Sequence, residues 1–226
     1  MTDRIFTDTE LEEMGKQTVD LIKQAIDAGD LEKAKKLTGR MYREFYSMHE
    51  GFRDTVTALL TFIGRRFGDE VLYDALHEGF SSFADLSKVY EKESVRRKVE
   101  MLAAGLRGHL TKLVIKEDDE KITVMMDPCG SGGRAVINGS YEPPTNFLKV
   151  KKHPVMTLGY DDFPVYCCHC PFQDLIPMEA SGQPIWVTEP SAHPGKEPCI
   201  FIFYKDKKLI PDKYYQRFGK EKPANK

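Results

Sequence analysis

The chain has 226 residues and a formal net charge of −2; 41% of its residues are hydrophobic and 30% are charged. This length suits one large domain or two small ones, and the composition is that of an ordinary globular protein with a substantial core. The balanced charge argues against nucleic acid or an anionic membrane as a partner, and no apolar run approaches the roughly 20 residues that a membrane helix needs.

The first residues, Met1 to Phe6, lack the apolar core of a signal peptide, which predicts a cytoplasmic protein. The chain has five cysteines, all in its C-terminal half. In a reducing compartment these cysteines are expected to be thiols, thiolates or metal ligands rather than disulfides.

The N-terminal half predicts a series of amphipathic helices. Thr7 and Glu10 form a capping-box pattern before a helix whose apolar residues recur at helical spacing as far as Gly29. Asp30 is expected to cap a second helix, and Gly51 is expected to break it.

A third predicted helix ends at Gly68, Asp69 caps a fourth, and a longer helix runs from about Ser82. Short links between helices predict antiparallel neighbours in a bundle. His49 and His77 lie on these helices and are expected to be surface or core residues.

The C-terminal half predicts strands and loops. Residues 112–116 and 121–126 flank an acidic turn and predict a hairpin. The apolar run 199–204 is the best candidate for a central strand, and 184–188 predicts another strand. A short amphipathic helix is expected over 172–180.

Together these patterns predict an α+β fold, in which a helical bundle precedes a small, mainly antiparallel sheet with long loops. The expected domains are a helical region over residues 1–110, a cysteine-rich region of strands and loops over 111–215, and a flexible basic tail over 216–226.

Three cysteines and a histidine are adjacent in the run Tyr166-Cys167-Cys168-His169-Cys170-Pro171. If this run is an extended strand, Cys167 and His169 share one face, and Pro171 frees Cys170 to turn toward either face. Thiolate and imidazole groups are the usual ligands of tetrahedral zinc, and soft thiolate sites also suit iron. The sequence therefore predicts a zinc site, with iron as the alternative. The expected ligands are Cys129, Cys167, His169 and Cys170; Cys168 and Cys199 are either further ligands or buried thiols.

A glycine-rich loop surrounds Cys129, in the run Asp127-Pro128-Cys129-Gly130-Ser131-Gly132-Gly133-Arg134. Such a loop can point backbone N–H groups inward and bind an anion, so Gly132 and Gly133 are candidate substrate-binding residues. Arg134 can hold a substrate carboxylate in bidentate fashion. The alternative is a tight turn with a solvated arginine.

Other polar residues remain candidates for the same site. Glu179 and Glu189 can act as a general base or as ligands, and His153 and His193 can ligate or transfer protons. The sequence does not distinguish among these roles.

Cys170-Pro171, and the run Gly195-Lys196-Glu197-Pro198-Cys199-Ile200-Phe201 after a helical N-terminal half, resemble the L-2-amino-thiazoline-4-carboxylic acid hydrolase-like family. The resemblance covers about the last third of the chain and the helical plan. It implies hydrolysis or ring opening at a C–N bond of a small molecule. The segments 127–134 and 167–170 belong to no pattern attributable to that family, which puts the substrate in doubt.

Three functions follow as hypotheses. The first is a metal-dependent enzyme of the hydrolase type, acting on a small carboxylate-bearing molecule through a metal-bound water. The second is a non-catalytic zinc-binding or redox-sensing module. The third is a metal-free cysteine enzyme, with Cys129 as nucleophile and His169 as base.

Overall fold

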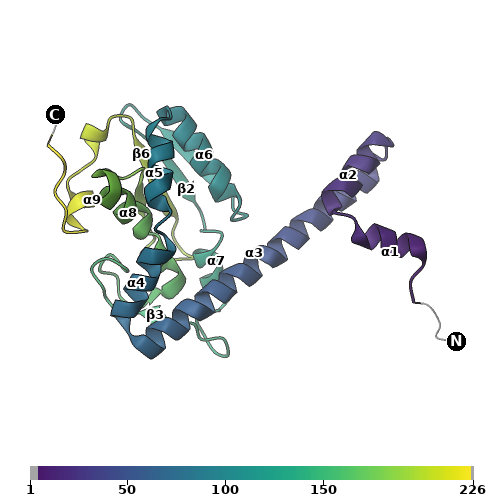
Figure 1. Ribbon diagram of the computed structural model, residues 1–226, viewed down its shortest axis with the longest axis horizontal. Helices are drawn as coiled ribbons and strands as arrows, with labels where there is room; N and C mark the ends of the chain where they lie inside the picture. The colour runs from purple at the N-terminus through teal and green to yellow at the C-terminus, as the bar shows by residue number, and fades with distance from the viewer. Residues whose placement is uncertain (1–4, 225–226) are drawn as a thin grey trace. The chain divides into compact units, whose positions relative to one another are not determined.

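The computed structural model describes residues 5–224, so residues 1–4 and 225–226 lie outside the described part of the chain (Figure 1). Backbone contacts group the chain into two units, one up to Phe52 and one from Arg53 onward. The fold is α+β as predicted, because a helical first part is followed by small antiparallel sheets. No helix among the described residues is long and apolar enough to span a membrane.

The first unit holds α1 (Asp8–Gly15), α2 (Thr18–Asp27) and the beginning of α3 (Leu31–Phe67). The predicted capping box is confirmed, since the Thr7 hydroxyl accepts from the Glu10 N–H and the Glu10 carboxylate accepts from the Thr7 N–H. The predicted break at Gly51 is wrong, because α3 continues through it. One glycine costs a helix interior only about 1 kcal/mol, which a helix of 37 residues can absorb.

The second unit begins within α3 and continues with α4 (Asp69–Gly79), α5 (Phe83–Glu91) and α6 (Val95–Arg107). Gly68, with φ +85°, separates α3 from α4 as expected. The long helix expected from Ser82 is two helices. Ser94 ends the continuity because its backbone is extended and its hydroxyl accepts the Arg97 N–H, which starts α6.

A four-stranded antiparallel sheet follows, with the order β1-β2-β6-β5. The predicted hairpin is confirmed as β1 (Leu113–Glu117) and β2 (Lys121–Met126), and the predicted central strand is β6 (Cys199–Tyr204). The remaining strand of this sheet is β5 (Val187–Glu189), and β3 (Lys149–Val150) pairs with β4 (Phe163–Pro164) in a second small sheet. Short helices complete the described chain: α7 (Gly132–Ile137), η1 (Val165–His169), α8 (Phe172–Ser181), η2 (Lys207–Leu209) and α9 (Lys213–Gln216).

The two faces of β6 pack against different cores, because side chains alternate along a strand. Cys199, Phe201 and Phe203 belong to the cluster that packs against α6, whereas Ile202 belongs to the cluster that contains Tyr214 and Tyr215 near α9. In Figure 1, α6 lies beside β2, in agreement with the contacts between them. Cys199 therefore sits at the start of a fully covered strand, on its α6 side.

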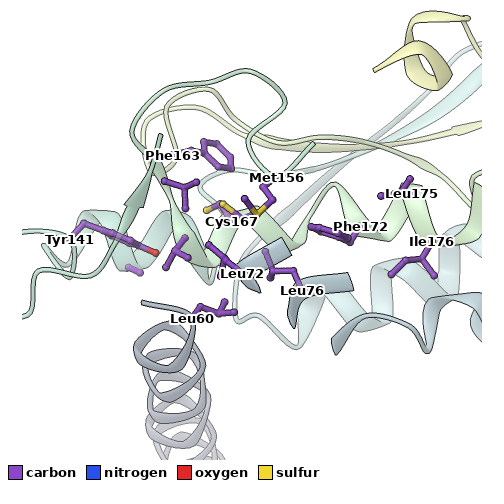
Figure 2. Close-up of a cluster of buried hydrophobic side chains, with 14 residues drawn as sticks. Leu60, Leu72, Leu76, Tyr141, Met156, Phe163, Cys167, Phe172, Leu175 and Ile176 are labelled. Atoms are coloured by element: carbon purple, nitrogen blue, oxygen red, sulfur yellow. The ribbon is translucent and has the colours of Figure 1, made fainter. Parts of the chain in front are cut away.

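A separate apolar core joins α3, α4, η1 and α8 (Figure 2). Leu60 of α3 and Leu72 and Leu76 of α4 meet Phe172 at the start of α8. Cys167 belongs to this core as well, so the segment that carries the cysteine run is anchored by ordinary apolar packing.

The cysteine run is not the extended strand that the sequence suggested. β4 is confined to Phe163–Pro164, and Val165–His169 forms a 3₁₀ turn that leads into α8. Successive side chains on such a turn point in directions about 120° apart instead of alternating between two faces. The prediction that Cys167 and His169 share one face of a strand is therefore wrong, because this segment is a 3₁₀ turn.

The C-terminal segment contacts the rest of the fold both before residue 216 and at two residues of the range 216–226 that was expected to be a tail. Tyr214 and Tyr215 are buried, and the guanidinium of Arg217 binds the buried carboxylate of Asp174 and donates to the Thr188 carbonyl at 2.9 Å. Further along, Lys222 donates to the Lys208 carbonyl at 2.7 Å.

Candidate functional site

A small cavity lies where β2 ends and β6 begins. Its volume is about 30 Å³, enough for one or two water molecules. Met126, which pairs with Cys199 across the two strands, forms part of its wall. Sulfur and imidazole groups from four segments of the chain also line it, and these belong to Cys129, Cys167, Cys170, Cys199, His109 and His169. The expectation that distant cysteines lie around one space is therefore met at this cavity.

Cys129 is buried and its sulfur receives several hydrogen bonds at once. The Cys199 thiol donates to it, and so do the backbone N–H groups of residues 131, 132 and 133. These donors outweigh the cost of burying a charge and lower the pKa of Cys129 to about 6. A protein thiol with this pKa is mostly thiolate near neutral pH.

The chain folds into this arrangement because the loop closes on itself. The Arg134 N–H donates to the Cys129 carbonyl at 2.9 Å, and the Ala135 N–H donates to the Ser131 carbonyl at 2.9 Å. These two bonds begin α7 and turn the intervening N–H groups toward the sulfur. The N–H groups of the glycine-rich loop are therefore directed at the sulfur of its own Cys129, and binding of a substrate anion by this loop stays a prediction.

Cys199 and Cys129 influence each other's ionisation in opposite directions. The pKa of the Cys199 thiol is raised far above its ordinary value, first because the thiol donates to Cys129 and then because it is buried. The neighbouring sulfurs of Cys170 and Cys167 raise it further. The two cysteines line one cavity and titrate as a coupled pair, in which Cys129 is the more acidic.

Close neighbours surround Gly132 and Gly133, and those at Gly132 leave no room for a side chain. A Cβ on Gly132 would overlap the sulfur of Cys167. A Cβ on Gly133 would lie 3.1 Å from the Cys129 Cβ and 3.1 Å from the Gly195 nitrogen, which belongs to the loop before β6. Both glycines were predicted to bind substrate, and in the structure their N–H groups are directed at the Cys129 sulfur.

Sequence reasoning missed a polar chain beside the thiolate. His109 Nδ1 lies 2.5 Å from the Ser131 hydroxyl, which is also hydrogen-bonded to the phenol of Tyr166. Burial raises the pKa of Tyr166 to about 12, so the phenol keeps its proton. All three residues line the cavity. A histidine shortly after a helix carries no signal of its own, and only the fold brings His109 to Ser131.

His169 is held by partners other than Cys129. Its Nδ1 lies 2.5 Å from the Tyr166 carbonyl, so this nitrogen carries the proton and Nε2 is an acceptor. The Cys170 sulfur lies 3.7 Å from Nε2 and donates to it. Phe80 stacks on the ring at a centroid distance of 5.0 Å. Burial lowers the pKa of His169, which keeps the ring neutral.

The other cysteines of the run are ordinary buried thiols. Burial is the main cause that raises the pKa of Cys167, Cys168 and Cys170 above the usual value. Cys168 donates to the Pro164 carbonyl at 3.7 Å and points away from the cavity wall. Neutral thiols in these positions act as small hydrophobic side chains with a weak donor.

The prediction of a zinc-binding protein is corrected by the arrangement of these groups. Among residues 5–224 there is no group of three or more His, Cys, Asp or Glu side chains that could hold a metal ion. Cys129, Cys167, His169 and Cys170 line one cavity, yet they do not form such a group. The hydrolase function that was built on a metal-bound water loses its basis with that site.

Arg134 and the remaining candidates lie outside the cavity wall. The Arg134 guanidinium donates to the carbonyls of His109 and Leu110 at 3.2 and 3.3 Å. The four other predicted polar residues bind local partners: Glu179 with His77, Glu189 with Tyr214, His153 with the N–H groups of residues 155 and 156, and His193 with Ser191.

Comparison with protein-family models, with curated proteins and with solved structures finds no match for this chain. The resemblance to the L-2-amino-thiazoline-4-carboxylic acid hydrolase-like family therefore stays a prediction from the sequence.

Proposed function

We propose that the protein is a metal-free thiol enzyme, in which the Cys129 thiolate attacks an electrophilic carbon of a small molecule. The observation that supports this most directly is the set of hydrogen bonds on the Cys129 sulfur, from the Cys199 thiol and from backbone N–H groups. Catalytic thiols need such donors because the thiolate is the reactive form. A cysteine that served only as core packing would be a neutral thiol, as Cys168 is.

The donors also suit the charge movement of the reaction. When a thiolate adds to a carbonyl or imine carbon, its negative charge moves to the oxygen or nitrogen of the substrate. The N–H groups of residues 131–133 then lose their sulfur anion and lie beside the new one. Donors fixed before the reaction stabilise such an anion without reorganisation, which is a large contribution to many enzyme rates.

Protons would move along the chain of His109, Ser131 and Tyr166. The Ser131 hydroxyl is bonded to both neighbours and lines the cavity beside Cys129. We assign it the transfer of a proton to the group that leaves the substrate, with His109 as the source. The base role predicted for His169 is not part of this proposal, because its two ring nitrogens are bound to Tyr166 and Cys170.

The size and lining of the cavity limit the substrate. A volume of about 30 Å³ admits only a small group, and most of its wall is apolar or sulfur. Pro190 and Ser191 line both this cavity and an open groove of about 600 Å³, which is lined also by Tyr160, Glu189 and Lys213. The reacting group would enter the cavity while the rest of the substrate occupies the groove.

The test is acyl transfer to the protein from p-nitrophenyl acetate, which delivers one acetyl group to a reactive thiolate. Mass spectrometry of the reduced full-length chain should find the acetyl group on Cys129, at a rate that rises with pH through about 6. Cys129→Ala should abolish this labelling, whereas the matched variant Cys168→Ala should retain it. Equal labelling of all cysteines in the native protein would refute the proposal.

A further inference from the structure

Cys129 has a second thiol as its direct hydrogen-bond donor, which nucleophilic attack on carbon does not require. Cys199 is the first residue of the central strand β6, and its cross-strand partner Met126 lies three residues before Cys129. This pairing places the loop of Cys129 beside the start of β6, and both cysteines line the same cavity. A thiolate beside a thiol is the arrangement needed to form a disulfide from an oxidised intermediate.

The cavity also suits a very small oxidant better than a large one. Its volume is that of one or two water molecules, and a hydroperoxide group has a similar size. The N–H groups of residues 131–133 and the Ser131 hydroxyl supply donors for the oxygen atom that leaves. An alkyl group on the peroxide would lie outside this space, toward the groove that Pro190 and Ser191 also line.

We propose that Cys129 and Cys199 form a redox pair that reduces small hydroperoxides, with a Cys129–Cys199 disulfide as the protein product. This inference rests on the thiolate of the proposed function but not on its carbon chemistry. Cys129 is the attacking thiol because the backbone donors converge on its sulfur, and Cys199 is the resolving thiol because it is the cysteine that donates to that sulfur.

The reaction balances in two steps. The Cys129 sulfur attacks the terminal peroxide oxygen, the O–O bond breaks, and the departing alkoxide takes a proton through Ser131 to leave as an alcohol. Cys129 is then a sulfenic acid. The Cys199 sulfur attacks the Cys129 sulfur, its proton joins the departing hydroxyl group as water, and the disulfide forms. A dithiol reductant returns both residues to thiols.

Cys170 is the competing resolving thiol, since it also lines the cavity. Its sulfur donates to His169 Nε2 at 3.7 Å, whereas Cys199 donates to Cys129 itself. The pairing with Cys199 is therefore favoured, and Cys170→Ala is the matched control.

The experiment treats the reduced full-length protein with hydrogen peroxide and with tert-butyl hydroperoxide near neutral pH. The expected product has lost two hydrogen atoms, keeps three of its five thiols, and yields one linked peptide pair that contains residues 129 and 199. Dithiothreitol should restore all five thiols. Cys170→Ala should behave like the native chain.

Cys199→Ala should instead stop at the sulfenic acid, which gains one oxygen atom and reacts with dimedone at Cys129. Cys129→Ala should form neither product. The rate should exceed that of free cysteine at least tenfold. The lowered pKa alone accounts for only about a twofold gain, because greater ionisation is offset by weaker nucleophilicity. A tenfold gain therefore measures the contribution of the donors around Cys129.

Three results would overturn the inference: a disulfide to Cys170, oxygen addition without a disulfide in the native chain, or a rate no higher than that of free cysteine. The acetyl-transfer experiment separates the two proposals. If Cys129 takes the acetyl group but forms no disulfide with Cys199, only the peroxide inference fails. If Cys129 shows no thiolate reactivity in either experiment, both fail.

Discussion

The Cys199 thiol donates a hydrogen bond to the Cys129 sulfur, and it is the largest single cause of the lowered pKa of Cys129. The bond joins the first residue of β6 to the loop after β2, and these two strands are paired along their whole length. The reactivity of one cysteine is therefore set by the register of a sheet.

The first prediction concerns that bond. Cys199→Ala removes a donor to a charged sulfur, which typically stabilises the charge by about 1.5–3 kcal/mol, and so the ionisation midpoint of Cys129 should rise by about one pH unit or more from its value of about 6. The ultraviolet absorbance of the thiolate, followed against pH and corrected with Cys129→Ala, measures this midpoint. Cys168→Ala, which removes a buried thiol bonded to Pro164, should leave it unchanged. An unchanged midpoint in Cys199→Ala would contradict the assigned bond.

The second prediction concerns the glycines of the loop. Gly132→Ala forces a Cβ against the Cys167 sulfur, so it should destabilise the fold by about 1–3 kcal/mol and slow labelling of Cys129. Gly105→Ala in α6 is the matched control, since a Cβ there meets no atom within 4 Å. That change should stabilise the helix by roughly 0.5–1 kcal/mol. Urea unfolding followed by circular dichroism compares the two, and equal effects would argue against close packing at Gly132.

The third prediction concerns the buried carboxyl of Asp174. Burial raises its pKa from 3.8 to about 6, even though Arg217 and Thr188 partly oppose the shift. A carboxyl with a raised pKa favours the folded state below pH 3.8, and this contribution is lost as the pH rises through about 6. The native chain should therefore lose up to about 3 kcal/mol relative to Asp174→Asn between these limits.

Urea unfolding of both proteins across this pH range gives the comparison. The comparison uses the slope of the unfolding free energy against pH. Asp174→Asn also removes the ion pair with the Arg217 guanidinium, which lowers the unfolding free energy at every pH. Parallel curves for the two proteins would show that Asp174 does not titrate in this way.

The fourth prediction concerns the start of α6. Ser94→Ala removes the hydroxyl that accepts the Arg97 N–H, which should cost about 1 kcal/mol of folding free energy. Ser82 precedes α5 but its side chain makes no such bond, so Ser82→Ala should change the unfolding free energy by less. Thermal unfolding of the two variants tests this difference, and the expectation fails if Ser82→Ala is the more damaging change.

Much of the fold could be predicted because its signals are local. Thr7 with Glu10, and the two apolar runs around the acidic turn, each determine a neighbouring structure through bonds a few residues apart. Gly51 was wrongly expected to break the helix, because a single glycine is only a weak helix breaker and α3 continues through it.

The site was only partly predictable. The loop of Cys129 carries a recognisable glycine pattern. Its position near the later cysteines was predicted because the proposed metal site needed a fourth ligand from another part of the chain. The sequence could not choose which cysteines pair, because that depends on the register that places Cys199 opposite Met126. Nor could it place His109 beside Ser131, since no short-range pattern joins residues from separate elements.

The hairpin of β1 and β2 has a practical consequence for engineering the protein. Its turn at residues 118–120 is exposed, and the six residues of β2 separate it from the cysteine cavity by roughly 20 Å. A reporter domain or affinity tag inserted at this turn would leave the thiol chemistry intact. The opposite end of the same strand would not tolerate such an insertion.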